Sequence, residues 1–164
     1  MQSKAQRVGV FVDVQNMYYS AKQLHNSKVN FKEILKQAIA DRNFIRAIAY
    51  VIKADVGEEK NFFDALSHIG YEVKAKDLQI FYGGAKKGDW DVGICMDIIG
   101  LAPKLDTVIL VSGDGDYVDL LQHVKRAMGC RLEVMAFGRS CSSKLKEAAD
   151  QFTDLDNKRY LIKK

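Results

Sequence analysis

The chain has 164 residues, of which 25 are Lys or Arg and 21 are Asp or Glu, so its formal net charge at pH 7 is +4. Apolar residues make up 48% and charged residues 28% of the sequence, which excludes a collagen, a coiled coil and a wholly disordered chain. This length suits one domain with its own hydrophobic core. We therefore expect a single domain over residues 1–164, with its core at about 7–155 and a frayed basic tail at 157–164.

The sequence also bears on the cellular setting. Its first residues, MQSKAQR, are polar and lack the apolar region of a signal peptide, and no apolar run approaches the roughly 20 residues of a membrane helix. Cys95, Cys130 and Cys141 have no Cys-x-x-Cys spacing, which indicates neither a disulfide framework nor a thiolate zinc site. We expect a cytoplasmic protein with no membrane partner, whose positive charge permits a polyanionic one.

Short β-branched runs alternate with helical patterns along the chain. Strands are expected, in chain order, at Val8–Val12, Ile45–Ile52, Thr107–Val111 and Arg131–Phe137, with one bent strand or two strands within 71–82. Between them, apolar residues recur at helical spacing around residues 31–39, 62–69, 92–99, 117–124 and 145–149. This alternation predicts right-handed crossovers, and so an α/β fold with a mostly parallel sheet and helices on both faces.

Two of the most apolar predicted strands end in carboxylates. Asp13 follows Val8–Val12, whereas Asp114 and Asp116 follow Thr107–Val111. Ligands of parallel α/β sheets bind outside the carboxyl ends of the strands, so these side chains are candidates for a site. An Asp in such a turn can instead cap the following helix. The doubled Asp-x-Asp, and the recurrence on two strands, favour a site.

A third carboxylate is expected from the helix that precedes Thr107–Val111. A helix that leads into a parallel strand runs antiparallel to it, so its first residues lie at the same edge of the sheet. Asp91 opens this helix and either joins the site or only caps the helix. Asp97 lies about 9 Å further along at ~1.5 Å per residue and is rotated away, so we expect it to support the site.

These carboxylates suggest a metal centre. Clustered carboxylates repel one another unless a cation lies among them. All-oxygen ligands suit Mg²⁺ or Mn²⁺, and either ion can bind a substrate phosphate, polarise its oxygens and activate a water. The pattern therefore favours phosphodiester hydrolysis.

Other functional motifs are missing or incomplete. Neither G-x-x-x-x-G-K-[ST] nor G-x-G-x-x-G occurs. Asp114-x-Asp116 does not open a calcium loop, because Lys125 stands where the bidentate Glu is needed. In the glycine-rich loop 83–88, Lys86 and Lys87 precede the proposed site and either hold phosphates or are simply solvated.

Several segments follow one another in the order of a known family. They are FVDVQNMYYS at 11–20, KGDWDVGICMDII at 87–99 and VSGDGDYVDLL at 111–121, and SKLKEAADQFTDL at 143–155 is similar to that family's last helix and strand. Together they resemble the NYN domain family, specifically its bacterial LabA-like branch within the PIN-like nuclease superfamily. The resemblance covers nearly the whole chain. It implies a Rossmann-like (PIN-like) three-layer α/β/α sandwich and a divalent-metal ribonuclease site.

The resemblance also assigns roles by motif position. The residues implied to be catalytic and to bind Mg²⁺ or Mn²⁺ are Asp13, Asp91, Asp114 and Asp116. We expect supporting or substrate contacts from Asn16, Ser112, Lys86, Lys87 and Asp97. The branch often has K-G-x-D, whereas Asp89 and Trp90 intervene here, so either Asp89 or Asp91 points inward.

Three functions are considered for this sequence. The first is a metal-dependent ribonuclease acting on RNA, and on single-stranded RNA in particular. The second is a non-hydrolytic RNA-binding or regulatory module that uses the same cleft, against which the intact carboxylates argue. The third is a phosphatase of the haloacid dehalogenase type, which would need an Asp where this chain has Gln15.

Overall fold

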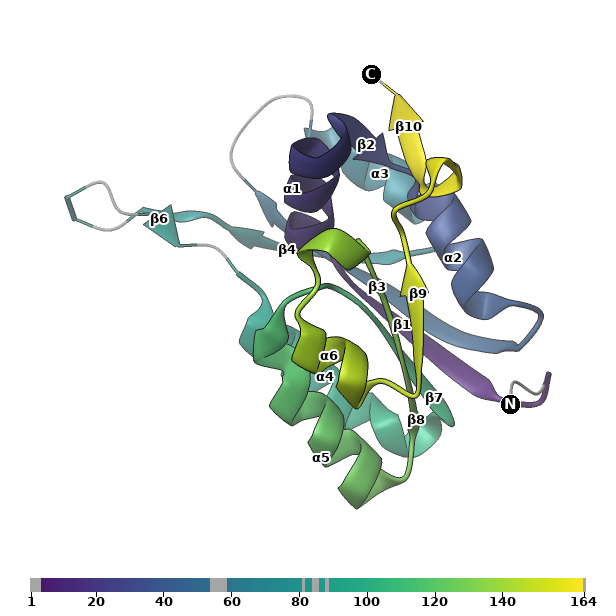
Figure 1. Cartoon of the computed structure of the whole chain (residues 1–164). Coiled ribbons are helices and arrows are strands. Elements are labelled where there is room, and N and C mark those ends of the chain that lie inside the picture. Colours follow the sequence, from purple (N-terminus) through teal and green to yellow (C-terminus); the bar gives the residue numbers. More distant parts are fainter. Residues whose placement is uncertain (1–3, 54–58, 81, 84–85, 88, 164) are drawn as a thin grey trace.

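The computed structural model describes residues 4–53, 59–80, 82–83, 86–87 and 89–163 (Figure 1). A six-stranded sheet with the order β4-β3-β1-β7-β8-β9 forms its centre, and all neighbouring strands in it are parallel. The strands are β1 (Arg7–Asp13), β3 (Asn43–Lys53), β4 (Glu72–Asp77), β7 (Thr107–Val111), β8 (Arg131–Ala136) and β9 (Gln151–Asp154). The prediction of an α/β fold around a mostly parallel sheet is confirmed.

Helices cover both faces of this sheet (Figure 1). One face carries α1 (Val14–His25), α2 (Phe31–Ile39) and α3 (Glu59–Ile69); the other carries α4 (Asp91–Leu101), α5 (Val118–Met128) and α6 (Ser143–Ala148). Between them lie the 3-10 turns η1 (Ala102–Lys104), η2 (Gly115–Tyr117), η3 (Gly138–Ser140) and η4 (Lys158–Tyr160). Because helices cover both faces, β7 is buried along its whole length and β1 from Val8 onward, as expected for continuous apolar runs.

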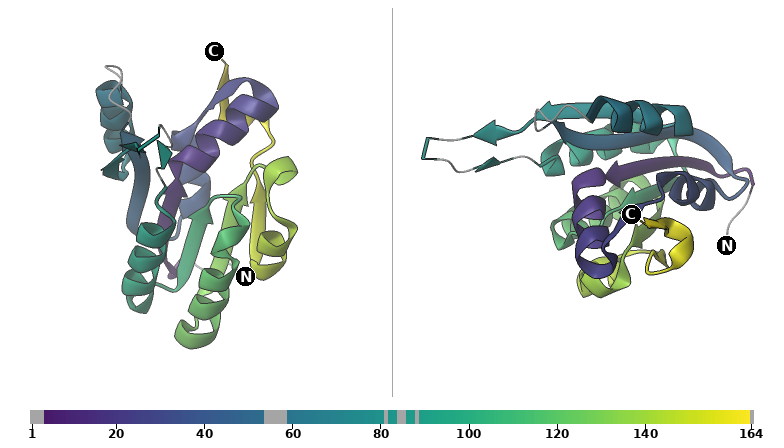
Figure 2. Two further views of the ribbon diagram at one scale, coloured as in Figure 1. Left: turned by 90° about the vertical axis from the view of Figure 1, so that its left-hand side faces the viewer. Right: turned by 90° about the horizontal axis from the view of Figure 1, so that it is seen from above.

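Within the predicted segment 71–82, the described residues form two strands that belong to different sheets. β4 adds to the edge of the main sheet, whereas β5 (Gln79–Ile80) pairs antiparallel with β6 (Lys86–Lys87). This two-stranded ribbon extends away from the body of the molecule (Figure 2). The ribbon leaves the molecule on the side where β4 ends.

The expectation of a frayed C-terminal tail is wrong. Residues Leu161–Lys163 form β10, which pairs antiparallel with β2 (Ser27–Val29). Just before β10, the carbonyl of the buried Tyr160 accepts a 2.8 Å hydrogen bond from the backbone N–H of Asn30. The tail is ordered because it pairs with β2, in the connection between α1 and α2. This partner is far away in sequence, so no local pattern predicts it.

The described helices are all short. None of them has the length and apolar character needed to cross a membrane.

Candidate metal centre

The central strands bring the predicted carboxylates to one edge of the sheet. β1 and β7 are parallel neighbours, so their carboxyl ends, at Asp13 and at the turn after Val111, lie side by side. α4 runs in the opposite direction and begins at Asp91, at that same edge. Asp13 and Asp114 therefore lie at one edge of the sheet although 101 positions separate them in the sequence.

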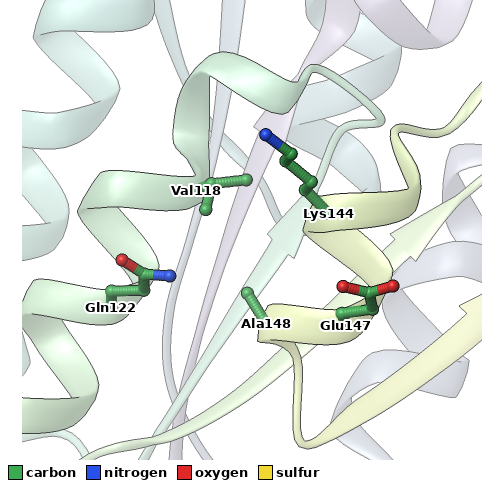
Figure 3. A pocket seen from close by; sticks show the side chains of 5 residues that line it. All are labelled: Val118, Gln122, Lys144, Glu147 and Ala148. Carbon is green, nitrogen blue, oxygen red and sulfur yellow. The ribbon is translucent and has the colours of Figure 1, made fainter.

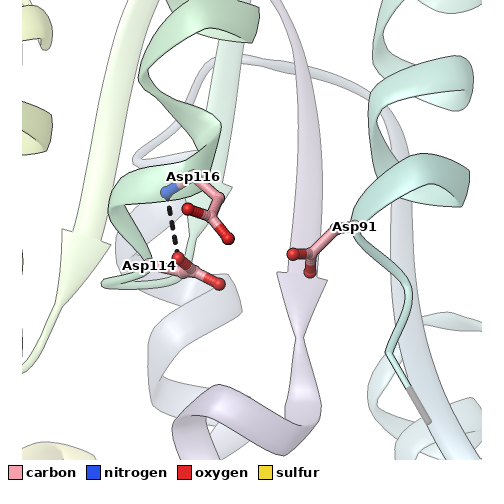
Figure 4. Close-up of side chains that lie close together, drawn as sticks. All are labelled: Asp91, Asp114 and Asp116. Atoms are coloured by element: carbon pink, nitrogen blue, oxygen red, sulfur yellow. Dashed lines mark hydrogen bonds between the residues drawn. The ribbon is translucent and has the colours of Figure 1, made fainter. Parts of the chain in front are cut away.

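Three of the carboxylates form a close group. Each of Asp91, Asp114 and Asp116 places an oxygen within 4.8 Å of an oxygen of the other two. Figure 4 shows Asp91 projecting from α4 toward Asp114 and Asp116, in the turn after β7. Three carboxylates at this spacing offer oxygen ligands to one divalent cation.

The sequence left open whether these aspartates cap helices or form a site: Asp13 and Asp114 both cap helices, and Asp114 also belongs to the close group. Asp114 accepts a 2.9 Å hydrogen bond from the backbone N–H of Asp116, and Asp13 accepts one of 3.2 Å from that of Asn16. Both bonds are N-terminal caps. For Asp114, the bond occupies one of its two oxygens, so capping and membership of the group are compatible.

Asp91, rather than Asp89, belongs to the group. Asp89 accepts a 3.3 Å hydrogen bond from the backbone N–H of Asp91 at the start of α4. Burial raises the pKa of Asp91, and the nearby charges of Asp114, Asp89 and Asp116 raise it further. The group is thus electrostatically unfavourable in the absence of a cation.

Asp13 lies just behind this group and is not part of it. Its side chain is buried, and its Oδ2 accepts 3.3 Å hydrogen bonds from the hydroxyls of Ser112 and Tyr117. Burial raises the pKa of Asp13 to about 6, with a smaller contribution from Asp91, although its hydrogen bonds oppose the shift. Its assignment as a metal ligand stays a prediction.

The two polar residues predicted beside the carboxylates hold the loop after β7. Asn16 Oδ1 accepts a 3.0 Å hydrogen bond from the backbone N–H of Gly113. The Ser112 hydroxyl donates to Asp13 and accepts a 3.2 Å bond from the backbone N–H of Asp114. Both side chains therefore connect the ends of β1 and β7.

Gly113 and Gly115, on either side of Asp114, lie where the backbone packs too closely for a side chain. A Cβ on Gly115 would lie 2.8 Å from the Oγ and 3.0 Å from the Cβ of Ser142, and one on Gly113 would lie 3.2 Å from the Cα of Cys141. The loop before α6 presses against the carboxylate turn at these points. Glycine lets that loop approach the site closely.

Of the remaining predicted residues, Asp97 does not reach the group. Asp97 lies deeper in α4 and accepts hydrogen bonds of 2.8 Å from the Tyr50 hydroxyl and 2.7 Å from Lys74 Nζ. Burial alone would raise the pKa of Asp97, but these bonds outweigh it and hold the pKa below its usual value. Lys86 and Lys87 have a described backbone in β6, but their side chains lie outside the part of the chain that the structure describes, as does Gly88.

Sequence reasoning missed Tyr117, which the structure places inside the site. The apolar stripe 117–124 predicts a buried ring, and Tyr117 is 1% exposed. Its hydroxyl lies 3.1 Å from Asp91 Oδ1 and 3.3 Å from Asp13 Oδ2. Burial first, and the neighbouring carboxylates second, raise the pKa of Tyr117, so the phenol stays protonated at neutral pH. A stripe pattern reveals that a ring is buried but not where its hydroxyl points.

A pocket elsewhere on the molecule offers no competing site for a divalent cation. It has a volume of about 310 Å³ and opens between α5 and α6 (Figure 3). Its lining contains one acidic side chain, Glu147, and one basic side chain, Lys144. The sheet edge remains the candidate centre.

Comparisons with known proteins agree with these motifs. The family model described as NYN domain matches residues 7–156, which span β1 to the end of β9 and so include the whole carboxylate edge. Low amplitude and bright protein LabA from Synechococcus elongatus is 27% identical over 173 aligned positions, which cover 100% of this chain and 91% of LabA. A crystal structure of a protein of unknown function from Vibrio parahaemolyticus is 34% identical with a TM-score of 0.90, over 99% of this chain and 100% of that one.

Proposed function

The chain belongs to the NYN domain family, in its LabA-like group, and on that basis we propose that it is a divalent-metal-dependent ribonuclease. One observation carries the proposal. Three carboxylates, one from α4 and two from the turn after β7, converge within 4.8 Å at the carboxyl edge of a parallel sheet. This is the edge at which parallel α/β folds bind their ligands.

The donor set fits a hard divalent cation. Asp91, Asp114 and Asp116 provide oxygen ligands only, and the group contains no His or Cys that would favour zinc. These three residues would hold Mg²⁺ or Mn²⁺, with open positions left for water and an RNA phosphate. When bound, such an ion polarises a phosphoryl oxygen and lowers the pKa of its water.

The rival function is RNA binding without hydrolysis. A protein that only bound phosphates would gain nothing from three clustered carboxylates, because they repel a polyanion unless a cation screens them. The intact group therefore favours catalysis over simple binding.

Removal of the metal tests the proposal directly. We expect a labelled single-stranded oligoribonucleotide to be cleaved with Mn²⁺ or Mg²⁺ and to stay intact with EDTA, because the carboxylates need the ion to activate water. Cleavage products are measured on a denaturing gel. Protein that binds a range of RNAs but cleaves none of them with either ion would favour the binding module instead. Equal cleavage in EDTA would rule out the proposed metal mechanism.

We also propose that the β5–β6 ribbon contributes to RNA binding. The double variant Lys86→Gln, Lys87→Gln should bind RNA more weakly, and its affinity should depend less on salt, by about one to two phosphate contacts in the log–log slope. The affinity is measured by fluorescence anisotropy between low and moderate salt. The matched control, Lys32→Gln with Lys36→Gln, removes the same charge from exposed positions on α2, far from the ribbon (Figure 1). Equal slopes in the two double variants would contradict a role for the ribbon.

A further inference from the structure

We propose that Tyr117 is a positioning residue of the metal centre, which fixes Asp91 across the group and connects it to the buried Asp13. This inference depends on the metal centre of the proposed function but not on the cleavage of RNA. It concerns a side chain that contributes no carboxylate and that the sequence motifs do not single out.

The group needs a connection between two separate elements. Asp114 and Asp116 lie in one turn, where the backbone N–H of Asp116 donates to Asp114 and fixes the two relative to each other. Asp91 belongs to α4, so no shared turn sets its distance from them. Among the hydrogen bonds of the described residues, the Tyr117 hydroxyl is the one donor to the Asp91 carboxylate.

Tyr117 is well placed to make this connection. It directly follows Asp116 in η2, and its ring is 1% exposed, so packing holds the hydroxyl in place. That hydroxyl donates its proton to Asp91 at 3.1 Å or to Asp13 at 3.3 Å. One phenol therefore contacts carboxylates from β1 and α4 while belonging to the turn that carries the other two ligands.

An ordinary buried tyrosine would need only a single acceptor. Tyr71, for example, is buried and donates to the backbone carbonyl of Phe31 at 2.8 Å. The chain also offers a closely matched comparison in Tyr50, which is 1% exposed and donates at 2.8 Å to Asp97, the other aspartate of α4. Tyr50 and Tyr117 thus perform the same type of contact on one helix, and only Tyr117 touches the metal group.

The test measures Mn²⁺ affinity by isothermal titration calorimetry, with no RNA present. Tyr117→Phe keeps the ring and removes the hydroxyl, and we expect it to weaken Mn²⁺ binding by about 10–100-fold, the usual effect of losing a group that orients a metal ligand. Tyr50→Phe removes an equally buried hydroxyl from a carboxylate of α4 and should leave Mn²⁺ affinity unchanged. Circular dichroism and melting in EDTA establish that both variants are folded.

A second measurement asks whether Asp13 acts through Tyr117. Asp13→Asn should weaken Mn²⁺ binding in the wild-type background and have little further effect in the Tyr117→Phe background, because the connection is already lost. Equal, additive losses in the two backgrounds would show that Asp13 reaches the ion without Tyr117, and would overturn this part of the inference.

The outcomes separate this inference from the ribonuclease proposal. Unchanged Mn²⁺ affinity in Tyr117→Phe, or an equal loss in Tyr50→Phe, overturns the positioning role and leaves the ribonuclease proposal intact. The expected affinities without RNA cleavage support the positioning role and overturn the ribonuclease proposal. Wild-type protein that binds no Mn²⁺ overturns both.

Discussion

Asp114→Asn should reduce Mn²⁺-dependent cleavage of single-stranded RNA by more than about a hundredfold, since removing a ligand should cost at least as much as removing a group that orients one. The substitution removes the negative charge of one of the three grouped carboxylates but keeps a cap acceptor for the N–H of Asp116. RNA binding should persist in this variant, because the loss of negative charge does not weaken contacts to phosphate. The rate is measured by gel-resolved cleavage at saturating Mn²⁺, and binding by anisotropy.

The matched control is Asp119→Asn. Asp119 is exposed in the first turn of α5, three positions beyond Asp116, and is not part of the group. The Asp119→Asn substitution removes one negative charge close to the site, as Asp114→Asn does, and should leave the cleavage rate unchanged. A residual rate in Asp114→Asn close to that of Asp119→Asn would exclude Asp114 as a ligand.

Asp13→Asn should stabilise the metal-free protein by about 3 kcal/mol at pH 7.5. Burial raises the pKa of Asp13 from 3.8 to about 6, and a shift of one pKa unit corresponds to about 1.36 kcal/mol. The folded protein binds the Asp13 proton more tightly than the unfolded chain, so ionisation of Asp13 above about pH 6 destabilises the fold. Urea unfolding in EDTA measures the difference in the free energy of unfolding.

The stabilisation by Asp13→Asn should depend on pH. As the pH falls from 7.5 through about 6 toward 4, wild-type Asp13 becomes protonated in the folded state, and the advantage of the Asn variant should disappear. Asp150→Asn should instead lower the free energy of unfolding at pH 7.5. Burial would raise the pKa of Asp150, but hydrogen bonds from Lys125 Nζ and the Leu132 N–H outweigh it and lower the pKa. A lower stability of Asp13→Asn at pH 7.5 would mean that its hydrogen bonds outweigh the cost of burying its charge.

The sheet could be predicted because its central strands are apolar along their whole buried length. Val8–Val12 and Thr107–Val111 face helices on both sides, so each is a continuous hydrophobic run with a sharp polar end. β2 and β10 could not be predicted in this way. Each has three residues, and each is stabilised by the other across more than a hundred positions of sequence, which leaves no local pattern.

The site could be predicted in its parts but not in its geometry. The ends of β1 and β7 and the start of α4 identified the edge where Asp91 and Asp114 meet. The pattern could not show that Asp13 lies behind the group, because its depth depends on how Tyr117 and Ser112 pack around it. The distance across such a site is set by tertiary contacts, and motif spacing carries no information about it.

The pairing of β10 with β2 determines when the molecule can be completed during synthesis. Every residue of the carboxylate group has been translated by Asp116, whereas the partner of β2 is the segment Leu161–Lys163. At roughly 5–20 residues per second, a ribosome needs on the order of ten seconds to go from β2 to β10. During that interval the α1–α2 connection exposes an unpaired strand edge to other nascent chains. A chain that stalls after η2 therefore holds the whole metal group while β2 is still open to misassembly.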